Sequence, residues 1–434
     1  MQTSFSPAQL ADPATASSEA VIRRCVRCGF CTATCPTYVL LGNELDSPRG
    51  RIYLMKDMLE NQRQPTPEVV KHVDRCLSCL SCMTTCPSSV NYMHLVDHAR
   101  AYIEARYRRP LLERLIRGVL ASVLPYPRRF RFALALARAA RFAAPLLGQA
   151  ETLRPLAAML TMAPAKKAPK PQDKPSVVPD AKGRVILLQG CAEPVLKPEI
   201  RAAAVRLLNR CGYEVVFARG EGCCGALVHH MGREQASMAA ARRNIDAWTH
   251  ELEGKGLCAI VVTTSGCGTT VKDYGFMLRN DPAYSDKAER ISAIAKDITE
   301  LLAETDLPAA TPRGLTVAYH SACSLQHGQR LNEAPKTLLI KAGYKVVTPA
   351  EAHLCCGSAG VYNILQPTIA DQLGDRKVSH IERLAPDIIA SGNIGCSMQI
   401  GNRTTLSVVH TVELLDWATG GPEPPSLYQG FKGA

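Results

Sequence analysis

The second half of the chain alternates short, continuous apolar runs with helical patterns. An apolar run at 185–188 is followed by a helical pattern over 198–210 and a second run at 212–216. A longer helical pattern over 234–252 then leads to a third apolar run at 259–262. Short apolar runs separated by helices are typical of βαβ units, whose buried strands lie parallel. The pattern therefore predicts an α/β domain built on a parallel sheet.

The same order of elements recurs further along the chain. Apolar runs at 315–318, 343–347 and 387–390 accompany a helical pattern over 367–384. Both copies contain Gly-Tyr-x-Val-Val, and in both a cysteine precedes a Cys-Cys-Gly triplet by 32 positions. An identical interval indicates an internal duplication. We expect two cysteine-rich domains related by a pseudo-twofold axis, and their predicted ranges are 184–305 and 313–420.

The first 183 residues have a different character. Residues 1–22 are polar and predict a flexible lead, and residues 23–98 carry two cysteine runs, each followed by helical apolar spacing. Residues 99–160 form a basic amphipathic segment, and residues 161–183 are rich in Ala, Lys and Pro, which predicts a semi-rigid linker. The predicted fold class is α+β, with a helical module ahead of two duplicated α/β domains.

The basic amphipathic segment allows two interpretations. Apolar residues recur at helical spacing from Leu112 to Val123, whereas Arg114 and Arg117 lie off this stripe. Such a stripe can dock on a membrane surface. Alternatively, it belongs to a helical hairpin that packs on the preceding module and leaves its arginines in solvent. We expect the packed hairpin, because most amphipathic helices face a protein core.

The net charge of +12 is concentrated in one place. Residues 100–170 contain 15 Lys and Arg against 3 Asp and Glu, an excess as large as that of the whole chain. A basic stretch can face nucleic acid, an acidic partner or an anionic membrane. No aromatic interleaving or known binding module accompanies the arginines, which argues against nucleic acid as a partner.

Composition favours a metal-binding protein in a reducing compartment. Eighteen cysteines in 434 residues are too dispersed for a small disulfide scaffold. The first 20 residues lack both a basic start and an apolar run, so we expect no secretory signal. No stretch of 18 apolar residues occurs, so we expect no membrane-spanning helix. We expect a cytoplasmic protein.

Two cysteine runs near the start carry the strongest chemical signal. Residues 25–36 and 76–87 both read C-x2-C-x2-C-x3-C-P, the spacing of bacterial two-cluster ferredoxins. In that arrangement the fourth cysteine of each run binds the other cluster. Zinc sites use other spacings, so we expect two [4Fe-4S] clusters rather than zinc or disulfides. The predicted ligands are Cys25, Cys28, Cys31 and Cys86 for set A, and Cys76, Cys79, Cys82 and Cys35 for set B.

The repeated cysteines of the duplicated domains form two further sets. Each cysteine follows a predicted strand or precedes a predicted helix, and sites in open α/β sheets gather at the carboxyl ends of strands. A third [4Fe-4S] cluster, a zinc ion and a redox-active dithiol all remain open as occupants. We expect Cys191, Cys223, Cys224 and Cys267 to converge as set C, and Cys323, Cys355, Cys356 and Cys396 as set D. Cys211 and Cys258 are interpreted as buried core residues.

Histidines flank both of these sets. His229 and His230 follow the first Cys-Cys-Gly triplet, and His320, His327 and His353 surround the second set. They could shuttle protons at a quinone site. We favour the alternative that they hydrogen-bond around a metal loop.

The motifs resemble a known family. The Cys-Cys-Gly repeats are similar to the cysteine-rich domains of heterodisulfide reductases and of anaerobic glycerol-3-phosphate dehydrogenases. The order of ferredoxin module, basic segment and two cysteine-rich domains resembles the iron–sulfur subunits of bacterial glycolate oxidase. The similarity includes residues 28–38, 48–54, 265–268, 353–360 and 393–396. Each copy has four cysteines, whereas heterodisulfide-reductase domains often have five.

The resemblance implies an electron-transfer subunit without a catalytic residue of its own. Separate FAD-binding subunits of the same complex would oxidise glycolate to glyoxylate, and this chain would pass electrons towards a quinone, peripheral on the inner face of the cytoplasmic membrane. No G-x-G-x-x-G occurs, so we expect no flavin on this chain. The alternatives are an iron–sulfur subunit for lactate, glycerol 3-phosphate or a heterodisulfide, and a redox-sensing scaffold protein.

Overall fold

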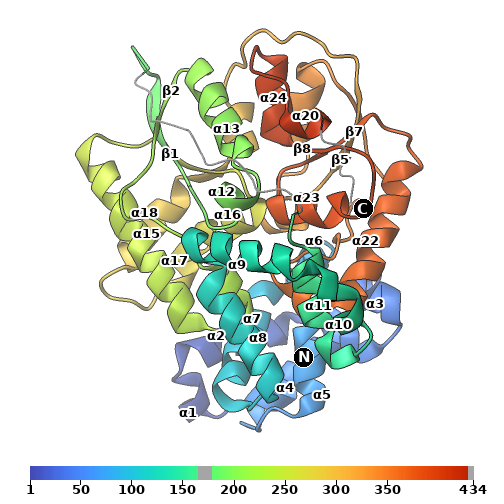
Figure 1. The fold of residues 1–434 in the computed structure, drawn as a ribbon. Helices are drawn as coiled ribbons and strands as arrows, with labels where there is room; N and C mark the ends of the chain where they lie inside the picture. Colours follow the sequence, from blue (N-terminus) through green and yellow to red (C-terminus); the bar gives the residue numbers. More distant parts are fainter. Residues whose placement is uncertain (165–177, 429–434) are drawn as a thin grey trace.

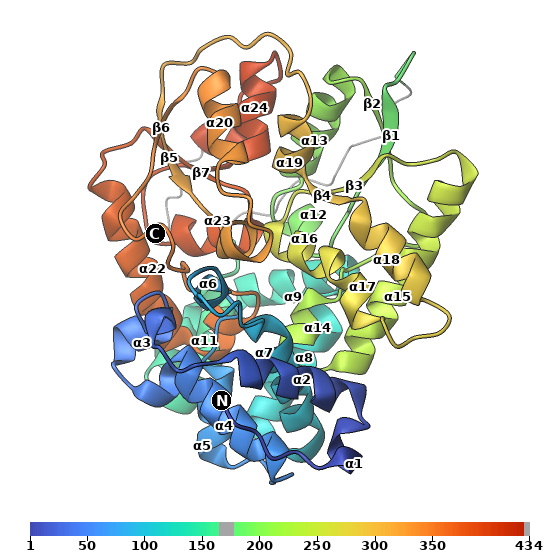
Figure 2. The same cartoon turned by 180° about the vertical axis from the view of Figure 1, so that it is seen from behind.

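The computed structural model describes residues 1–164 and 178–428. Most of the predicted linker, residues 165–177, lies outside the described residues. The helical module occupies the base of the molecule, and the two α/β domains stand side by side above it (Figure 1). The view from behind shows the same arrangement with the two domains exchanged left to right (Figure 2).

The first α/β domain contains a four-stranded parallel sheet in the order β2-β1-β3-β4. Its strands are β1 (Gly183–Leu187), β2 (Tyr213–Val216), β3 (Ala259–Val262) and β4 (Ala295–Asp297). Its helices are α12 (Glu193–Leu196), α13 (Glu199–Arg210), α14 (Ala226–His230), α15 (Glu234–Gly254), α16 (Ser265–Lys272), α17 (Tyr274–Met277), α18 (Ser285–Ala293) and α19 (Ile298–Ala303). The predicted parallel α/β architecture is confirmed.

The second α/β domain repeats this topology, with the strand order β6-β5-β7-β8 and all pairs parallel. Its strands are β5 (Thr316–His320), β6 (Lys345–Val347), β7 (Ile388–Ser391) and β8 (Val408–His410). The π-helix η5 (Ser324–Gly328) follows β5, and the helices are α20 (Ala334–Lys341), α21 (Tyr362–Leu365), α22 (Pro367–Glu382), α23 (Ile394–Gly401), α24 (Thr411–Ala418) and α25 (Pro425–Tyr428). The two sheets therefore share one strand order.

The two domains are joined by a mixed apolar and ionic interface. Helices α13 and α24 pack together, and one apolar core contains buried residues of both domains. The guanidinium groups of Arg206 and Arg210 each lie 2.5 Å from a carboxylate oxygen of the buried Asp416. Nε2 of His410 donates a hydrogen bond to the carbonyl oxygen of Thr263 at 2.9 Å if that nitrogen is protonated. These contacts fix one domain against the other.

The module at the base is helical, as predicted. It comprises α1 (Pro7–Leu10), α2 (Pro13–Arg24), η1 (Phe30–Thr32), α3 (Pro36–Leu41), η2 (Glu44–Asp46), α4 (Pro48–Glu60), α5 (Pro67–Asp74), α6 (Ser81–Thr84) and α7 (Tyr92–Arg106). Residues 1–22, for which the sequence indicated a flexible lead, are folded instead. Helix α2 packs on α7, and Ile22 is fully buried in the core of the module. The buried apolar residues of α2, the adjacent Val21 and Ile22, are too few to show a helical pattern in a polar sequence.

The basic segment forms α8 (Leu111–Val123), α9 (Pro127–Ala139), η3 (Arg141–Ala143), α10 (Ala144–Gly148), η4 (Glu151–Leu153) and α11 (Arg154–Thr161). Ile116 and Leu120 of α8 are buried, as expected for a packed helix, but they lie against residues of both α/β domains and not on the preceding module. Arg117, expected in solvent, is buried and lies 2.9 Å from Asp74 of the module. Its guanidinium is satisfied there by carboxylates, which explains how a residue off the apolar stripe becomes buried.

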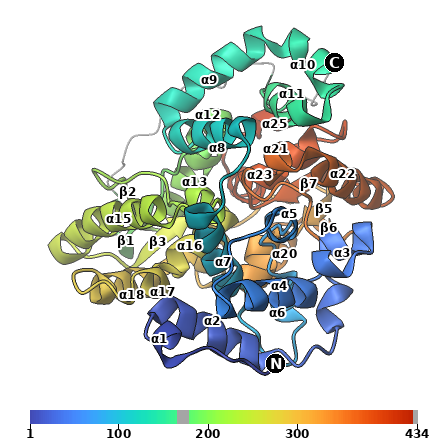
Figure 3. The same ribbon diagram turned by 90° about the horizontal axis from the view of Figure 1, so that it is seen from below.

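The other face of these helices remains exposed. Leu111, Leu115, Phe132, Leu136 and Phe142 all present exposed apolar side chains. Helices α9 and α10 form one edge of the molecule, opposite α1 and α2, when it is viewed from below (Figure 3). Among the described residues no helix combines the length and the apolar character needed to cross a bilayer.

Candidate metal centres

Set A surrounds a small cavity near the surface of the module. Cys25, Cys28, Cys31 and Cys86 line it together, so the fourth cysteine of the second run lies beside the first run. Cys28 is exposed and Cys31 and Cys86 are half-buried. Gly29 has φ +87°, a left-handed conformation that suits the tight loop between Cys28 and Cys31. Cys82 also touches this cavity, which places the two sets next to each other.

Set B surrounds a second, deeper cavity. Cys35, Cys76, Cys79 and Cys82 line it, and all four are buried. The loop that carries three of them is held by two left-handed residues, Ser78 with φ +49° and Leu80 with φ +63°. The structure therefore brings the eight ferredoxin-type cysteines together in the two groups of four that their spacing predicts. The identity of what each group binds remains a prediction.

The donor chemistry of both sets suits a cationic metal cluster. Burial raises the pKa of the Cys31 thiol to about 11, and neighbouring cysteines add to this effect. The pKa of the Cys79 and Cys82 thiols is raised further by complete burial and by nearby cysteines. Closely packed buried thiolates need a compensating positive charge. Iron ions supply that charge, so the residues present fit [4Fe-4S] clusters.

A buried ionic network supports set B, and the sequence did not reveal it. Arg51 of α4 is almost completely buried, and its Nη2 lies 3.4 Å from Asp46. Its Nε donates to the carbonyl oxygen of His72 at 2.6 Å, and its Nη1 lies 3.8 Å from Sγ of Cys35. A permanent positive charge therefore lies beside a predicted ligand. An arginine within a helical pattern is normally solvated, so no signal in the sequence marks it.

Set C converges at the carboxyl edge of the first sheet, as expected. The Sγ atoms of Cys191 and Cys223 lie 3.5 Å apart. Cys224 interacts with both Cys223 and Cys267, and these neighbours together with burial raise its pKa well above the usual value. Gly225 has φ +87°, and a Cβ there would lie 3.1 Å from the carbonyl oxygen of Ser237. The loop is thus shaped so that adjacent cysteines face one site.

Set D converges in the same way at the second sheet. Sγ of Cys323 and Sγ of Cys355 lie 3.6 Å apart, and Cys356 interacts with both Cys355 and Cys396. Nδ2 of Asn393 donates to Sγ of Cys396 at 3.2 Å. Gly357 has φ +89°, and a Cβ there would lie 2.6 Å from the carbonyl oxygen of Ala370. Only glycine fits that position without a backbone shift.

The two cysteines interpreted as core residues behave differently. Cys211 is buried in the core that both domains share. Cys258 is exposed, and its Sγ lies 3.2 Å from the carbonyl oxygen of Arg184. The interpretation of Cys258 as buried was therefore wrong, because its position precedes the buried strand β3 by one residue.

The flanking histidines have distinct environments. His327 is hydrogen bonded to Thr84 Oγ1 and to the carbonyl oxygen of His353, at 2.8 and 3.0 Å. His229 lies 3.1 Å from Asp97, and although burial opposes it, Asp97 raises the pKa of His229. Burial lowers the pKa of His230 to about 4. These contacts agree with hydrogen-bonding roles for His327 and His229.

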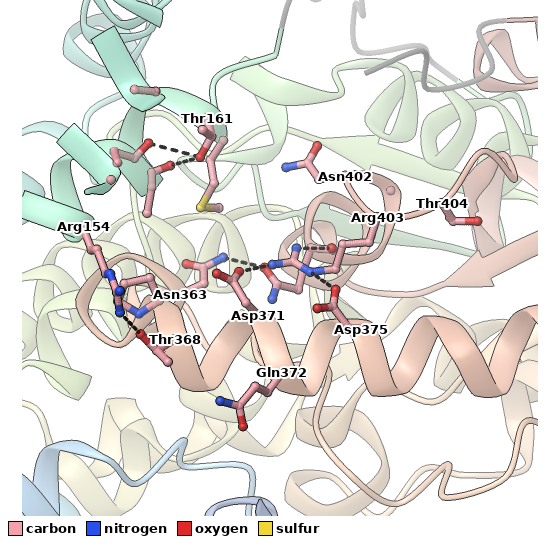
Figure 4. A pocket seen from close by; sticks show the side chains of 18 of the residues that line it. Arg154, Thr161, Asn363, Thr368, Asp371, Gln372, Asp375, Asn402, Arg403 and Thr404 are labelled. Carbon is pink, nitrogen blue, oxygen red and sulfur yellow. Dashed lines mark hydrogen bonds and ion pairs between the residues drawn. The ribbon is translucent and has the colours of Figure 1, made fainter. Parts of the chain in front are cut away.

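A large cavity, of about 1150 Å³, lies elsewhere, between α10 and α11 and the helices α22 and α23. Figure 4 shows Arg403 directed between Asp371 and Asp375, with Arg154 and Thr368 at one side. Its described lining contains several charged side chains and none of the cysteines. Its described lining therefore offers no thiol ligand for a metal.

Comparison with protein families matches two descriptions. Residues 21–90 match a 4Fe-4S dicluster domain, and residues 185–272 and 317–401 each match a cysteine-rich domain. These ranges contain sets A and B and sets C and D respectively. The chain therefore contains a 4Fe-4S dicluster domain followed by two cysteine-rich domains.

Several known proteins are similar over much of the chain. The glycolate oxidase iron–sulfur subunit of Escherichia coli (strain K12) is 42% identical over 96% of this chain and 99% of its own length. The probable glycolate oxidase iron–sulfur subunit of Bacillus subtilis (strain 168) is 32% identical over 93% of this chain and 95% of its own. Lactate utilization protein A of Bacillus pumilus (strain SAFR-032) is 30% identical over 54% of this chain and 99% of its own.

A solved structure shares the fold. A hypothetical protein from Helicobacter pylori aligns with a TM-score of 0.56 over 96% of this chain and 74% of its own, at 10% identity. At that identity the likeness concerns the fold alone.

Proposed function

This chain belongs to the family of glycolate oxidase iron–sulfur subunits, and from that premise we propose that it is the electron-transfer subunit of a glycolate-oxidising complex. FAD-binding subunits oxidise glycolate to glyoxylate, and this chain receives their electrons without a catalytic residue of its own. A quinone is the proposed final acceptor.

The observation that carries the proposal is the pairing of the two ferredoxin-type cavities. Set A opens to solvent, set B is buried, and Cys82 touches both cavities. [4Fe-4S] clusters bound at these positions supply one-electron transfer. The protein fixes the separation of the two positions and shields the inner one from water. Such an arrangement suits a path from the surface to the interior.

The surface around set A is the proposed docking site for the flavin partner. Val26 and Phe30, within the first cysteine run, are 66% and 63% exposed, and Tyr53 of α4 is exposed as well. Arg27 lies 5.4 Å from the centre of the Tyr53 ring. Exposed aromatic and apolar residues around a functional group mark a protein interface. A flavin subunit seated here would cover the exposed Cys28.

Set D extends the path on the other side of set B. Cys79 of set B shares one buried apolar cluster with Cys323 and Cys355 of set D. Tyr362 also belongs to this cluster, and its hydroxyl donates to the carbonyl oxygen of Arg75 at 3.0 Å. A third metal group, an iron–sulfur cluster or zinc, is proposed in at least one of the two cysteine-rich domains. An iron–sulfur group at set D would adjoin set B directly.

Peripheral contact with the cytoplasmic membrane is proposed for α8, α9, η3 and α10. Their exposed apolar residues lie on the segment that carries the whole positive excess of the chain. Phe142, at 85% exposure, is the most exposed of them. An apolar face bordered by arginines suits the boundary of an anionic bilayer. This contact would bring the chain close to a membrane quinone.

The test is reduction by substrate in the intact complex. The chain is co-expressed with its flavin subunits, purified without oxygen, and mixed with glycolate, D-lactate or glycerol 3-phosphate while the EPR spectrum is recorded. We expect glycolate to generate reduced iron–sulfur signals within the turnover time. If lactate but not glycolate reduced the iron–sulfur centres, lactate would be the substrate. If the chain did not co-purify with any flavin subunit, the proposal would be wrong.

A further inference from the structure

One histidine beside set D is placed differently from all the others named above. His320 is the last residue of β5 and is 2% exposed. Within the described part of the chain neither of its ring nitrogens meets the geometry of a hydrogen bond, although the thiol of Cys356 interacts with the ring. A buried imidazole with only a weak thiol partner is unfavourable, because its polar atoms have lost water and gained little in return.

The missing partner lies in the direction of the cysteines. A ring nitrogen of His320 and the Sγ atoms of Cys356 and Cys396 all lie within 4.8 Å of one another, and all three residues are buried. Neutral imidazole and thiolate are the donors that zinc and iron prefer in proteins. Three such atoms at this separation form a ligand group that the cysteine pattern alone does not include.

The first domain lacks this donor. Counting back three positions from the first cysteine of each set gives His320 before Cys323 and Leu188 before Cys191. Leu188 is buried in an apolar cluster that also contains Cys224 of set C. The duplicated sites therefore have different donor sets, although their four cysteines are equivalent.

We propose that His320 is a metal ligand, so that set D holds a mixed imidazole–thiolate centre while set C offers thiolates alone. The inference rests on the proposed metal in the second domain and adds a donor to it. The ligand class is a borderline-soft metal, either iron in a cluster or a zinc ion. If His320 binds iron in the place of one of the four thiolates, the potential of the centre rises, because a neutral ligand then takes the position of a charged one.

His327 shows what a purely structural histidine looks like in the same region. Its two nitrogens lie at hydrogen-bond distance from Thr84 and from the backbone of His353. His320 has no such contacts and faces two thiols instead. The contrast assigns His320 to the metal rather than to the packing of the domain.

The experiment measures metal rather than activity. The full chain with its partner subunits is purified anaerobically in its native form and as His320→Leu, which copies Leu188 of the first domain. His320→Cys restores a soft donor, Cys356→Ser removes a cysteine of set D, and His353→Ala is the matched histidine control. Iron, sulfide and zinc are quantified per chain, and the donor atoms are identified by pulsed EPR for iron and by X-ray absorption for zinc.

We expect a nitrogen donor in the native protein that is absent from His320→Leu and His320→Cys. His320→Leu should lose the metal that Cys356→Ser loses, and its metal affinity in competition with a chelator should fall by at least about tenfold. His320→Cys and His353→Ala should retain the metal. Retention in His320→Leu with an unchanged nitrogen signal would overturn the role of His320 alone. If Cys356→Ser also lost nothing, the metal in the second domain would fail as well, and sets A and B would still carry the proposed electron transfer.

Discussion

The hydroxyl oxygen of Thr84 and Nδ1 of His327 lie 2.8 Å apart, 243 positions away from each other in the chain. Thr84 ends the short helix that contains Cys82, and His327 belongs to the π-helix that follows Cys323. The bond thus joins the loop of set B to the loop of set D. Their separation is fixed by direct contact rather than by the intervening sequence.

The first prediction concerns this contact. Thr84→Val should lower the free energy of unfolding by about 1 kcal/mol, because it removes one partly buried hydrogen bond. In the His327→Phe background the same change should cost little, since the partner is already gone. A double-mutant cycle from chemical unfolding measures the coupling. Additive effects of the two substitutions would show that the contact contributes no stability.

The second prediction tests how the ferredoxin-type cysteines are shared. Cys28→Ser and Cys86→Ser should remove the same EPR signal, whereas Cys35→Ser and Cys79→Ser should remove the other. Each substitution should release about four iron atoms per chain if the centre is lost entirely. Cys211→Ser, in the apolar core, serves as the control and should retain all iron. If Cys35→Ser removed the same EPR signal as Cys28→Ser, the fourth cysteine of each run would bind the cluster of its own run.

The third prediction concerns the charge beside Cys35. Removing the positive charge in Arg51→Met should lower the reduction potential of the centre in set B by on the order of 100 mV, because the oxidised state carries less negative charge. Arg51→Lys keeps the charge and should stay near the native value. Adding Asp46→Asn to Arg51→Met should recover part of the fall. Redox titration followed by EPR gives the potentials, and equal values for the Met and Lys variants would contradict the electrostatic role.

The fourth prediction concerns the exposed face of α9 and the turn after it. Replacing Phe132 and Phe142 with Ser should reduce binding to vesicles that contain anionic phospholipid by at least about tenfold, because two aromatic anchors are lost. High salt should weaken binding of the native chain too, since the arginines act through screened charge. Ile340→Ser, at an exposed position on α20, is the control. Sedimentation with vesicles measures the effect, and equal binding by all three proteins would exclude this face.

The fifth prediction concerns pH and the buried Glu413 at the start of α24. Burial raises its pKa from 4.5 to about 7. The folded state therefore holds this proton more tightly than the unfolded chain. The contribution of the protonated carboxyl to the free energy of unfolding is complete below pH 4.5 and is lost as the pH rises to about 7. The loss is at most about 3 kcal/mol. Glu413→Gln should unfold at a higher temperature than the native chain at about pH 8, with a smaller difference at about pH 5.

Thermal unfolding between about pH 5 and about pH 8 measures this difference. Glu253→Gln, at an exposed position on α15, is the matched control and should follow the native curve. Parallel curves for the native chain and Glu413→Gln would show that the carboxyl is already ionised in the folded protein.

Much of the fold follows from pattern in the sequence. The apolar runs before Cys191 and Cys323 become β1 and β5, because four or more buried residues in succession suit a parallel strand. Strands β4 and β8 each have only three residues and escaped notice, whereas the equally short β6 was found because its Gly-Tyr-x-Val-Val run repeats that of β2. Helix α2 was missed for a related reason, since its buried Val21 and Ile22 stand alone in a polar stretch.

The sites were predictable only in part. Fixed spacing identified the cysteines, because one tight loop must present several donors to one group. Spacing could not show which histidine turns inwards, so His320 and His327 looked equivalent until their surroundings were known. The burial of Arg51 and Arg117 depends on carboxylates outside their own helical turns, Asp46 and Asp74 among them, and local pattern carries no trace of such partners.

The difference in solvent exposure between Cys28 and Cys79 has a practical consequence for handling this protein. The exposure that lets a partner protein come close to set A also lets dioxygen reach it. The buried Cys79 of set B is instead covered by the second α/β domain. Brief contact with air should therefore strip the outer metal first. Protein purified in air would keep the cluster at set B and lose the one at set A. It would still look brown but would no longer accept electrons from the flavin subunit.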